Sequence, residues 1–153
     1  MNVSKGLRQL AEYVTESEGD ERTYALCVFT DCALKEGTKD AERYCAEVLS
    51  RHLCETPSYE DDELFEAKTK SRKVTVDQLI DVVTRLDRSL DRELVKRVAM
   101  NALRQLKAET DDSIRARITK LLVSLGVPPL KIHSAELAIF AFATVATSLS
   151  QAA

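Results

Sequence analysis

The feature that most constrains the fold is a twenty-residue stretch that occurs twice, seventy-two positions apart. When residues 34–53 are aligned with residues 106–125, seven positions are identical. The identical pairs are Leu34 and Leu106, Lys35 and Lys107, Thr38 and Thr110, Asp40 and Asp112, Arg43 and Arg115, Leu49 and Leu121, and Leu53 and Leu125. Each copy joins two apolar, helix-like runs through a short polar turn that carries carboxylates. The similarity indicates an internal duplication of a helix–turn–helix unit.

Composition favours helices throughout the chain. Of the 153 residues 31% are charged and 44% are hydrophobic, with only 4 Gly and 3 Pro. Valine and isoleucine nowhere alternate with polar residues over the length of a strand. We therefore predict an all-α fold, a single-domain bundle of about seven to eight short helices spanning residues 1–153. Two repeat-like halves, at about 21–67 and 91–130, are expected to pack face to face with pseudo-two-fold symmetry.

Apolar spacing and capping residues place the individual helices. The predicted helices cover 3–16, 21–36, 38–53, a short acidic element through Leu64 and Phe65, a run from Thr75, 91–108, a run that Gly126 ends, and a last helix that Ser134 opens. Asp20 and Thr38 are predicted N-caps, and Gly37 is a predicted left-handed C-terminal residue. Ser58 with Asp61, and Thr75 with Gln78, resemble capping boxes. A basic linker over 68–73 is expected to join the two halves.

The two acidic turns are the candidate functional residues. The carboxylates are Glu36, Asp40 and Glu42 in the first half, and Glu109, Asp111 and Asp112 in the second. Carboxylates at a helix N-terminus interact favourably with the helix dipole, which explains several of them without any ligand. The alternative is that pseudo-symmetry gathers both turns at one end, where their oxygens bind a divalent cation such as Ca²⁺ or Mg²⁺.

These residues carry a family resemblance. From about 23 to 128 the chain resembles the tellurite-resistance TerB-like family, whose repeated motif is approximately Ala-Asp-Gly followed by a Glu on the next helix. The first half reads Lys35-Glu36-Gly37 with Glu42 near the later acid, whereas the second half lacks the Gly and has Arg115 or Arg117 where that acid belongs. The resemblance implies an all-helical, metal-binding module of the bacterial stress response, which acts through partner or cation binding.

Several function classes are disfavoured. The net charge of −3 and basic stretches without interleaved aromatic residues argue against nucleic acid. Neither His52 nor His133 lies in a recognisable catalytic motif, so we do not expect an enzyme. The four cysteines, Cys27, Cys32, Cys45 and Cys54, lack the close pairing typical of zinc sites and are expected to be free thiols.

The chain end suggests a further mode of action. The segment 137–149 is uncharged, but at thirteen residues it is too short to span a membrane. It is expected either to fill the bundle or to form an interface in a homo-oligomer. No signal peptide is recognisable, so we expect a cytoplasmic protein. We also expect it to bind a protein partner.

Overall fold

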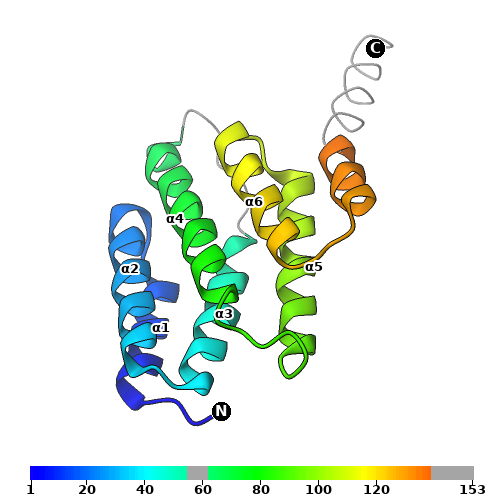
Figure 1. Ribbon diagram of the computed structural model, residues 1–153. Coiled ribbons are helices and arrows are strands. Elements are labelled where there is room, and N and C mark those ends of the chain that lie inside the picture. Colours follow the sequence, from blue (N-terminus) through cyan, green and yellow to red (C-terminus); the bar gives the residue numbers. More distant parts are fainter. Residues whose placement is uncertain (55–61, 139–153) are drawn as a thin grey trace.

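The computed structural model describes residues 1–54 and 62–138, and this part of the chain is entirely helical, without strands (Figure 1). Six of its helices are α1 (Lys5–Glu16), α2 (Gly19–Glu36), α3 (Lys39–Leu53), α4 (Phe65–Val83), α5 (Arg92–Ala108) and α6 (Asp112–Ser124). A seventh helical segment covers 129–138. The prediction of an all-α single domain is confirmed.

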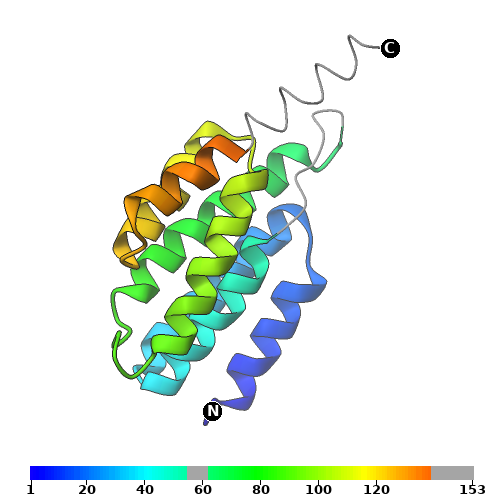
Figure 2. The same cartoon turned by 90° about the vertical axis from the view of Figure 1, so that its right-hand side faces the viewer.

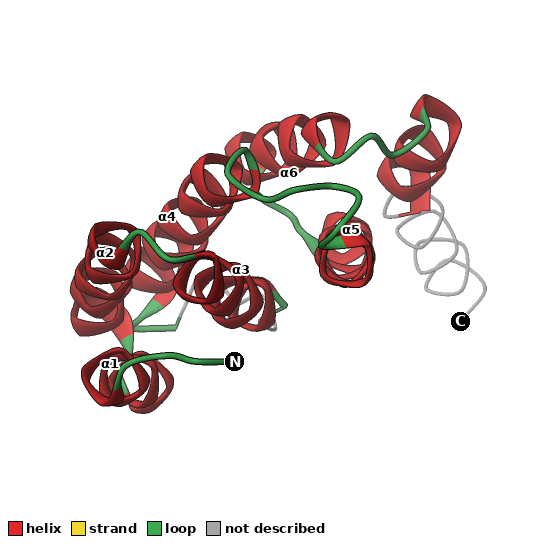
Figure 3. Ribbon diagram, turned by 60° about the horizontal axis from the view of Figure 1, so that its bottom comes forward, coloured by secondary structure: helices red, strands yellow, loops and turns green. Residues whose placement is uncertain are grey.

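The helices form two layers whose members run in opposite directions. Hydrogen bonds from Thr23 to Ser71 and from Thr30 to Gln78 join α2 to α4 at a constant offset of 48 residues, so these helices are parallel. Helix α4 also packs against α6, which completes one layer. Helices α1, α3 and α5 run the other way and form the second layer, as Figures 2 and 3 show. The segment 129–138 continues this second layer beyond α5 (Figure 3).

The core fills the space between the layers. Among its largest fully buried side chains are Phe29, Leu49, Leu79, Leu106 and Leu121. Leu49 and Leu121 occupy equivalent positions of the two repeated stretches, and both are 0% exposed. Burying a leucine contributes about 1.5–3 kcal/mol, which explains why these positions are apolar in both copies.

The central helix is α4 rather than α2. Helix α4 packs against α2, α3 and α6, whereas α2 keeps a solvent side on which Tyr24 is 68% exposed. The nearly continuous apolar pattern of residues 24–34 predicts a helix near the centre, and α2 does contact α1, α3 and α4, although its Tyr24 side borders solvent.

The prediction of a basic linker over 68–73, followed by a new helix at Thr75, is wrong. These residues lie inside α4, and Thr75 is buried with its hydroxyl donating to the Ser71 carbonyl oxygen at 2.8 Å. Ser and Thr hydroxyls favour N-caps, but inside a helix they can instead bond to the carbonyl oxygen four residues back, as Thr75 does here. Two of the expected helices merge into α4, and the described ranges contain seven helices, within the predicted seven to eight.

The turn chemistry was predicted in part. As expected, Gly37 has φ 66° and the Thr38 hydroxyl accepts from the Ala41 amide. Gly126, which was predicted to end a helix, also has a positive φ, of 79°. Asp20 is not an N-cap, because α2 already begins at Gly19. Ser134 does not open a helix either, because it lies within 129–138. The expected cap at Ser58 and the end of the last predicted helix lie outside the described residues.

Candidate functional site

The first acidic turn lies beside the N-terminus of the chain. Glu36 accepts a hydrogen bond from the Ser4 hydroxyl, and Asp40 accepts one of 3.0 Å from the Asn2 amide. This backbone bond is the main reason why the pKa of Asp40 is lowered. Glu42 is buried within the first turn of α3. The first turn therefore serves mainly to hold the N-terminal segment and the start of α3.

The second acidic turn is occupied by internal bonds. Glu109 is 0% exposed, and its carboxylate accepts bonds of 2.8 and 3.1 Å from the guanidinium of Arg72. The same carboxylate accepts from the Thr110 and Asp111 amides, which shapes the turn. Asp111 caps α6 by accepting from the Ile114 amide at 2.9 Å, and Asp112 is exposed in the first turn of α6.

The two turns lie at opposite ends of the molecule, so the expected shared carboxylate patch is wrong. Arg43, which directly follows Glu42 of the first acidic turn, bonds to Asp91 at the N-terminal end of α5. Glu109 lies at the C-terminal end of the same helix. An α-helix of 17 residues is about 25 Å long, which separates the turns. Figure 1 shows the α2–α3 and α5–α6 connections at opposite ends of the bundle.

The carboxylates are separated because the two hairpins point in opposite directions. Helix α4 lies between α2 and α6, so the hairpins contact each other mainly through α3 and α5 and do not pack face to face as the duplication suggested. Within residues 1–54 and 62–138, no three His, Cys, Asp or Glu side chains are grouped closely enough to hold a metal ion. The geometric basis for one cation site shared by all six carboxylates is therefore absent from this part of the chain.

A hollow between α1 and α3 is the best candidate site. It encloses about 390 Å³ and is lined by Ala11, Glu12, Thr15, Glu16, Tyr44, Val48, Arg51 and His52. Ala11 and Val48 are buried and form an apolar floor with the half-buried Tyr44. The hollow forms because α1 packs mainly against α2, whereas α3 and α5 pack closely side by side.

The walls of the hollow differ in charge. On the α1 wall, Glu12 and Glu16 are exposed one turn apart, and neither forms an ion pair with any residue described here. On the α3 wall, Arg51 pairs with Glu47 at 3.3 Å. The hollow therefore combines an apolar floor with net negative charge on one side.

His52 lies at one end of this hollow. Its Nε2 is 3.4 Å from the Thr15 hydroxyl. Burial, reinforced by the positive charges of Arg22 and Arg51, lowers the pKa of His52 to about 4. The imidazole is therefore neutral near pH 7, and it adds a hydrogen-bonding group to the hollow without adding charge.

Sequence reasoning missed both the hollow and the partner of Glu109. Arg72 stands in a basic run that reads as a solvated linker, although it is only 2% exposed. The residues of the hollow come from two helices, α1 and α3. The apolar periodicity of a helix indicates which of its sides faces the core, but it does not indicate which other helix lies beside it. One signal was present for Glu16, which has no basic residue three or four positions away, whereas Glu12 has Arg8 four positions before it.

Comparison with known proteins found no match among protein-family models, curated proteins or solved structures. The resemblance to the TerB-like family remains a prediction, based on the two helix–turn–helix halves and their acidic turns. Among the described helices, none combines the length and apolar character needed to cross a membrane.

Proposed function

We propose that this chain is a non-enzymatic helical module that binds a segment of a protein partner in the hollow between α1 and α3. The observation that carries the proposal is the arrangement of an apolar floor beside two unpaired carboxylates. Amphipathic helices bind in such grooves through apolar residues that repeat every three or four positions.

The charges of the hollow define the partner segment. Glu12 and Glu16 favour Lys or Arg residues one turn apart on the bound segment, because opposite charges across an interface speed association and exclude wrong partners. The apolar side chains of the segment would cover Ala11, Tyr44 and Val48. This is the partner-binding form of the function that the family resemblance implies, and it needs no cation.

A tryptophan placed in the hollow tests this proposal. The chain has no native tryptophan, so a Thr15→Trp variant reports only on this site. A synthetic amphipathic helical peptide with lysines at i and i+4 should produce a saturable blue shift of its emission. A Tyr24→Trp variant, on an exposed position of α2, should show no shift with the same peptide.

The carboxylates provide the second arm of this experiment. In the Thr15→Trp background, the double change Glu12→Gln and Glu16→Gln should weaken peptide binding by about fivefold or more, as expected for two lost charge pairs. A peptide that gives no saturable signal, or that binds equally well without the two carboxylates, contradicts the proposal.

A second candidate function is self-assembly through the segment 129–138. Leu130 is 83% exposed and Leu137 is 48% exposed, and their spacing of seven residues places both on one side of the helix. The segment is the last described helix of its layer (Figure 3). The uncharged segment 137–149 was also expected to form part of the assembly surface. Its residues from 139 onward lie outside the described part of the chain.

Light scattering distinguishes this second function from the first. If the leucines form an interface between copies, wild-type protein will be larger than a monomer and the double change Leu130→Glu and Leu137→Glu will dissociate it. Val123→Glu is the control, because Val123 is a similarly exposed apolar residue of α6. A monomeric wild type at all concentrations would exclude self-assembly and leave the hollow as the binding site.

A further inference from the structure

The solvent side of α5 carries a dense row of basic residues. Arg92, Lys96, Arg97, Arg104 and Lys107 are all exposed, and Glu93 is the only acidic residue among them. At 100° per residue these side chains fall within an arc of about 140° centred on Met100. Met100 itself is 53% exposed. We call these seven residues the α5 basic face.

Few of these charges are neutralised by the rest of the molecule. Arg97 lies 3.9 Å from Glu47 of α3, and this is the only ion pair of the α5 basic face with any described residue. Arg92 and Lys96 are one turn apart, a spacing at which like charges destabilise a helix. Positive charge in the first turns of α5 also interacts unfavourably with the helix dipole.

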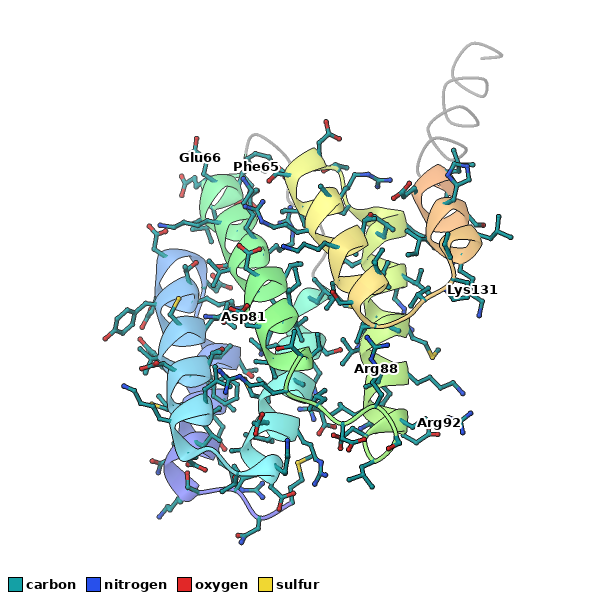
Figure 4. The ribbon with its side chains drawn as sticks, in the orientation of Figure 1. Phe65, Glu66, Asp81, Arg88, Arg92 and Lys131 are labelled. Atoms are coloured by element: carbon teal, nitrogen blue, oxygen red, sulfur yellow. The ribbon has the colours of Figure 1, made fainter. Side chains whose placement is uncertain are left out.

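The N-terminal end of α5 provides a site for an apolar contact. Leu90 is 76% exposed and borders a hollow of about 440 Å³ that Arg92 and Arg97 also line. Figure 4 shows Arg92 at this end of α5, projecting away from the bundle. Leu90 and Met100 therefore supply two separated apolar contacts, with cations between and beside them.

These features match an acidic helix better than a nucleic acid. The α5 basic face contains no aromatic ring on which a base can stack. The whole chain carries a net charge of −3, so a long polyanion meets overall repulsion beyond the local patch. A short acidic peptide senses only charges within a Debye length of about 8 Å at physiological salt, and its apolar residues can use Leu90 and Met100.

We propose that the α5 basic face is a second docking surface, which binds an acidic amphipathic helix of a protein partner. The carboxylates of that helix pair with the cations of α5, and its apolar side chains contact Met100 and Leu90. This surface is separate from the hollow between α1 and α3, and it selects the opposite charge.

Fluorescence anisotropy with a labelled synthetic peptide tests the proposal. The probe is a helical peptide with glutamates at i and i+4 and leucines on one side, and its control is a scrambled peptide of identical composition. We expect the ordered peptide to bind at least about fivefold more tightly than the scrambled one, because only the ordered peptide presents its leucines together. Its affinity should fall as NaCl is added.

Charge reversal locates the binding surface. The double change Lys96→Glu and Arg104→Glu should weaken binding by about tenfold or more. The matched control is Lys120→Glu with Lys131→Glu, two exposed cations of α6 and 129–138, which gives the same net charge and should change the affinity less than about twofold. If circular dichroism shows that the reversed variant is unfolded, Lys96→Gln with Arg104→Gln replaces it.

The other outcomes overturn the proposal. One is that the α5 variant and its control lose the same affinity, and another is that the scrambled peptide binds as tightly as the ordered one. The third is that no binding is seen at about 1 mM peptide, since so weak an affinity would not indicate a specific site. If duplex DNA or anionic vesicles bind more tightly than the peptide and displace it, the surface would be assigned to those ligands instead. The α5 variants should leave binding of the basic peptide to the Thr15→Trp reporter unchanged, which separates this result from that of the first proposal.

Discussion

Arg72 and Glu109 form a buried ion pair that joins the middle of α4 to the turn between α5 and α6. Arg72 is 2% exposed and Glu109 is 0% exposed, and two parallel hydrogen bonds of 2.8 and 3.1 Å connect them. Gln105 donates a third bond of 3.2 Å to the Glu109 carboxylate. One guanidinium nitrogen of Arg72, Nη1, is buried without a hydrogen-bond partner in the part of the chain described.

This pair predicts a large cost when one partner is removed. Glu109→Ala should lower the free energy of unfolding by about 3–5 kcal/mol, because it leaves the Arg72 charge buried and unpaired. Asp112→Ala is the control, since Asp112 is exposed at the start of α6 and its loss should cost at most about 1 kcal/mol. Urea denaturation measures both. Equal costs for the two variants would show that the pair is not buried in solution.

The double change Arg72→Met and Glu109→Leu gives a second test of the same pair. Apolar side chains of similar size remove both charges and the unpaired Nη1 together, so this variant should be more stable than Glu109→Ala alone. A double variant that is less stable than Glu109→Ala would contradict this expectation, whereas its comparison with wild type measures the contribution of the ion pair net of its desolvation cost.

His52 predicts a loss of stability in mild acid. Its pKa in the folded protein is lowered to about 4, below the ordinary value of 6.5, so the unfolded chain binds the proton first as the pH falls. The stabilisation is therefore present above pH 6.5 and is lost between 6.5 and about 4. Because the ring is only partly buried, we expect the loss to be about 1–2 kcal/mol.

A His52→Gln variant isolates this effect. The charged groups nearest His52 include Arg22 of α2 and Arg51 of α3, with Glu12 and Glu16 on the α1 wall of the hollow. Carboxylates also titrate toward the acid end of this range, so the informative quantity is the difference between wild type and variant in chemical denaturation at pH 7 and pH 5. A difference that does not change with pH would show that His52 keeps an ordinary pKa.

The cysteines should differ in reactivity toward alkylating reagents. Burial raises the pKa of the Cys45 thiol to about 12, whereas Cys27 is exposed on α2. At pH 8 we expect iodoacetamide to modify Cys27 first and Cys45 at least about a hundredfold more slowly, because thiolate is the reactive form and access requires opening of the core. Mass spectrometry of timed samples checks the order. Equal rates without denaturant would contradict the buried position of Cys45.

The separated turns predict the response to Ca²⁺. Each turn on its own supplies at most three carboxylates, and that of Glu109 is already bonded to Arg72. Since Ca²⁺ takes six to eight oxygen ligands, we expect added Ca²⁺ to leave the melting temperature unchanged. A rise that is lost in Asp40→Ala but kept in Asp112→Ala would place a cation at the first turn alone, and the reverse pattern would place it at the second.

Local signals predicted the ends of several helices. Gly37 and Gly126 adopt positive φ where the sequence predicted helix ends, and Thr38 caps α3. These predictions succeeded because the conformational freedom of Gly and the capping bond of Thr depend on neighbours within three or four residues. The same reasoning failed at Thr75 and Ser134, where a hydroxyl that can cap a helix lies inside one instead.

The amino-acid sequence by itself determined that the chain is helical, where most of its helices begin and end, and which side of each faces the core, because these properties follow from spacing and from short-range bonds. The tertiary structure alone decided that α4 is central, that Arg72 meets Glu109 across 37 residues, and that the two acidic turns lie at opposite ends. The physical reason is that the direction in which one helical hairpin packs against another depends on how all the apolar surfaces fit together, and no single stretch of sequence records that fit.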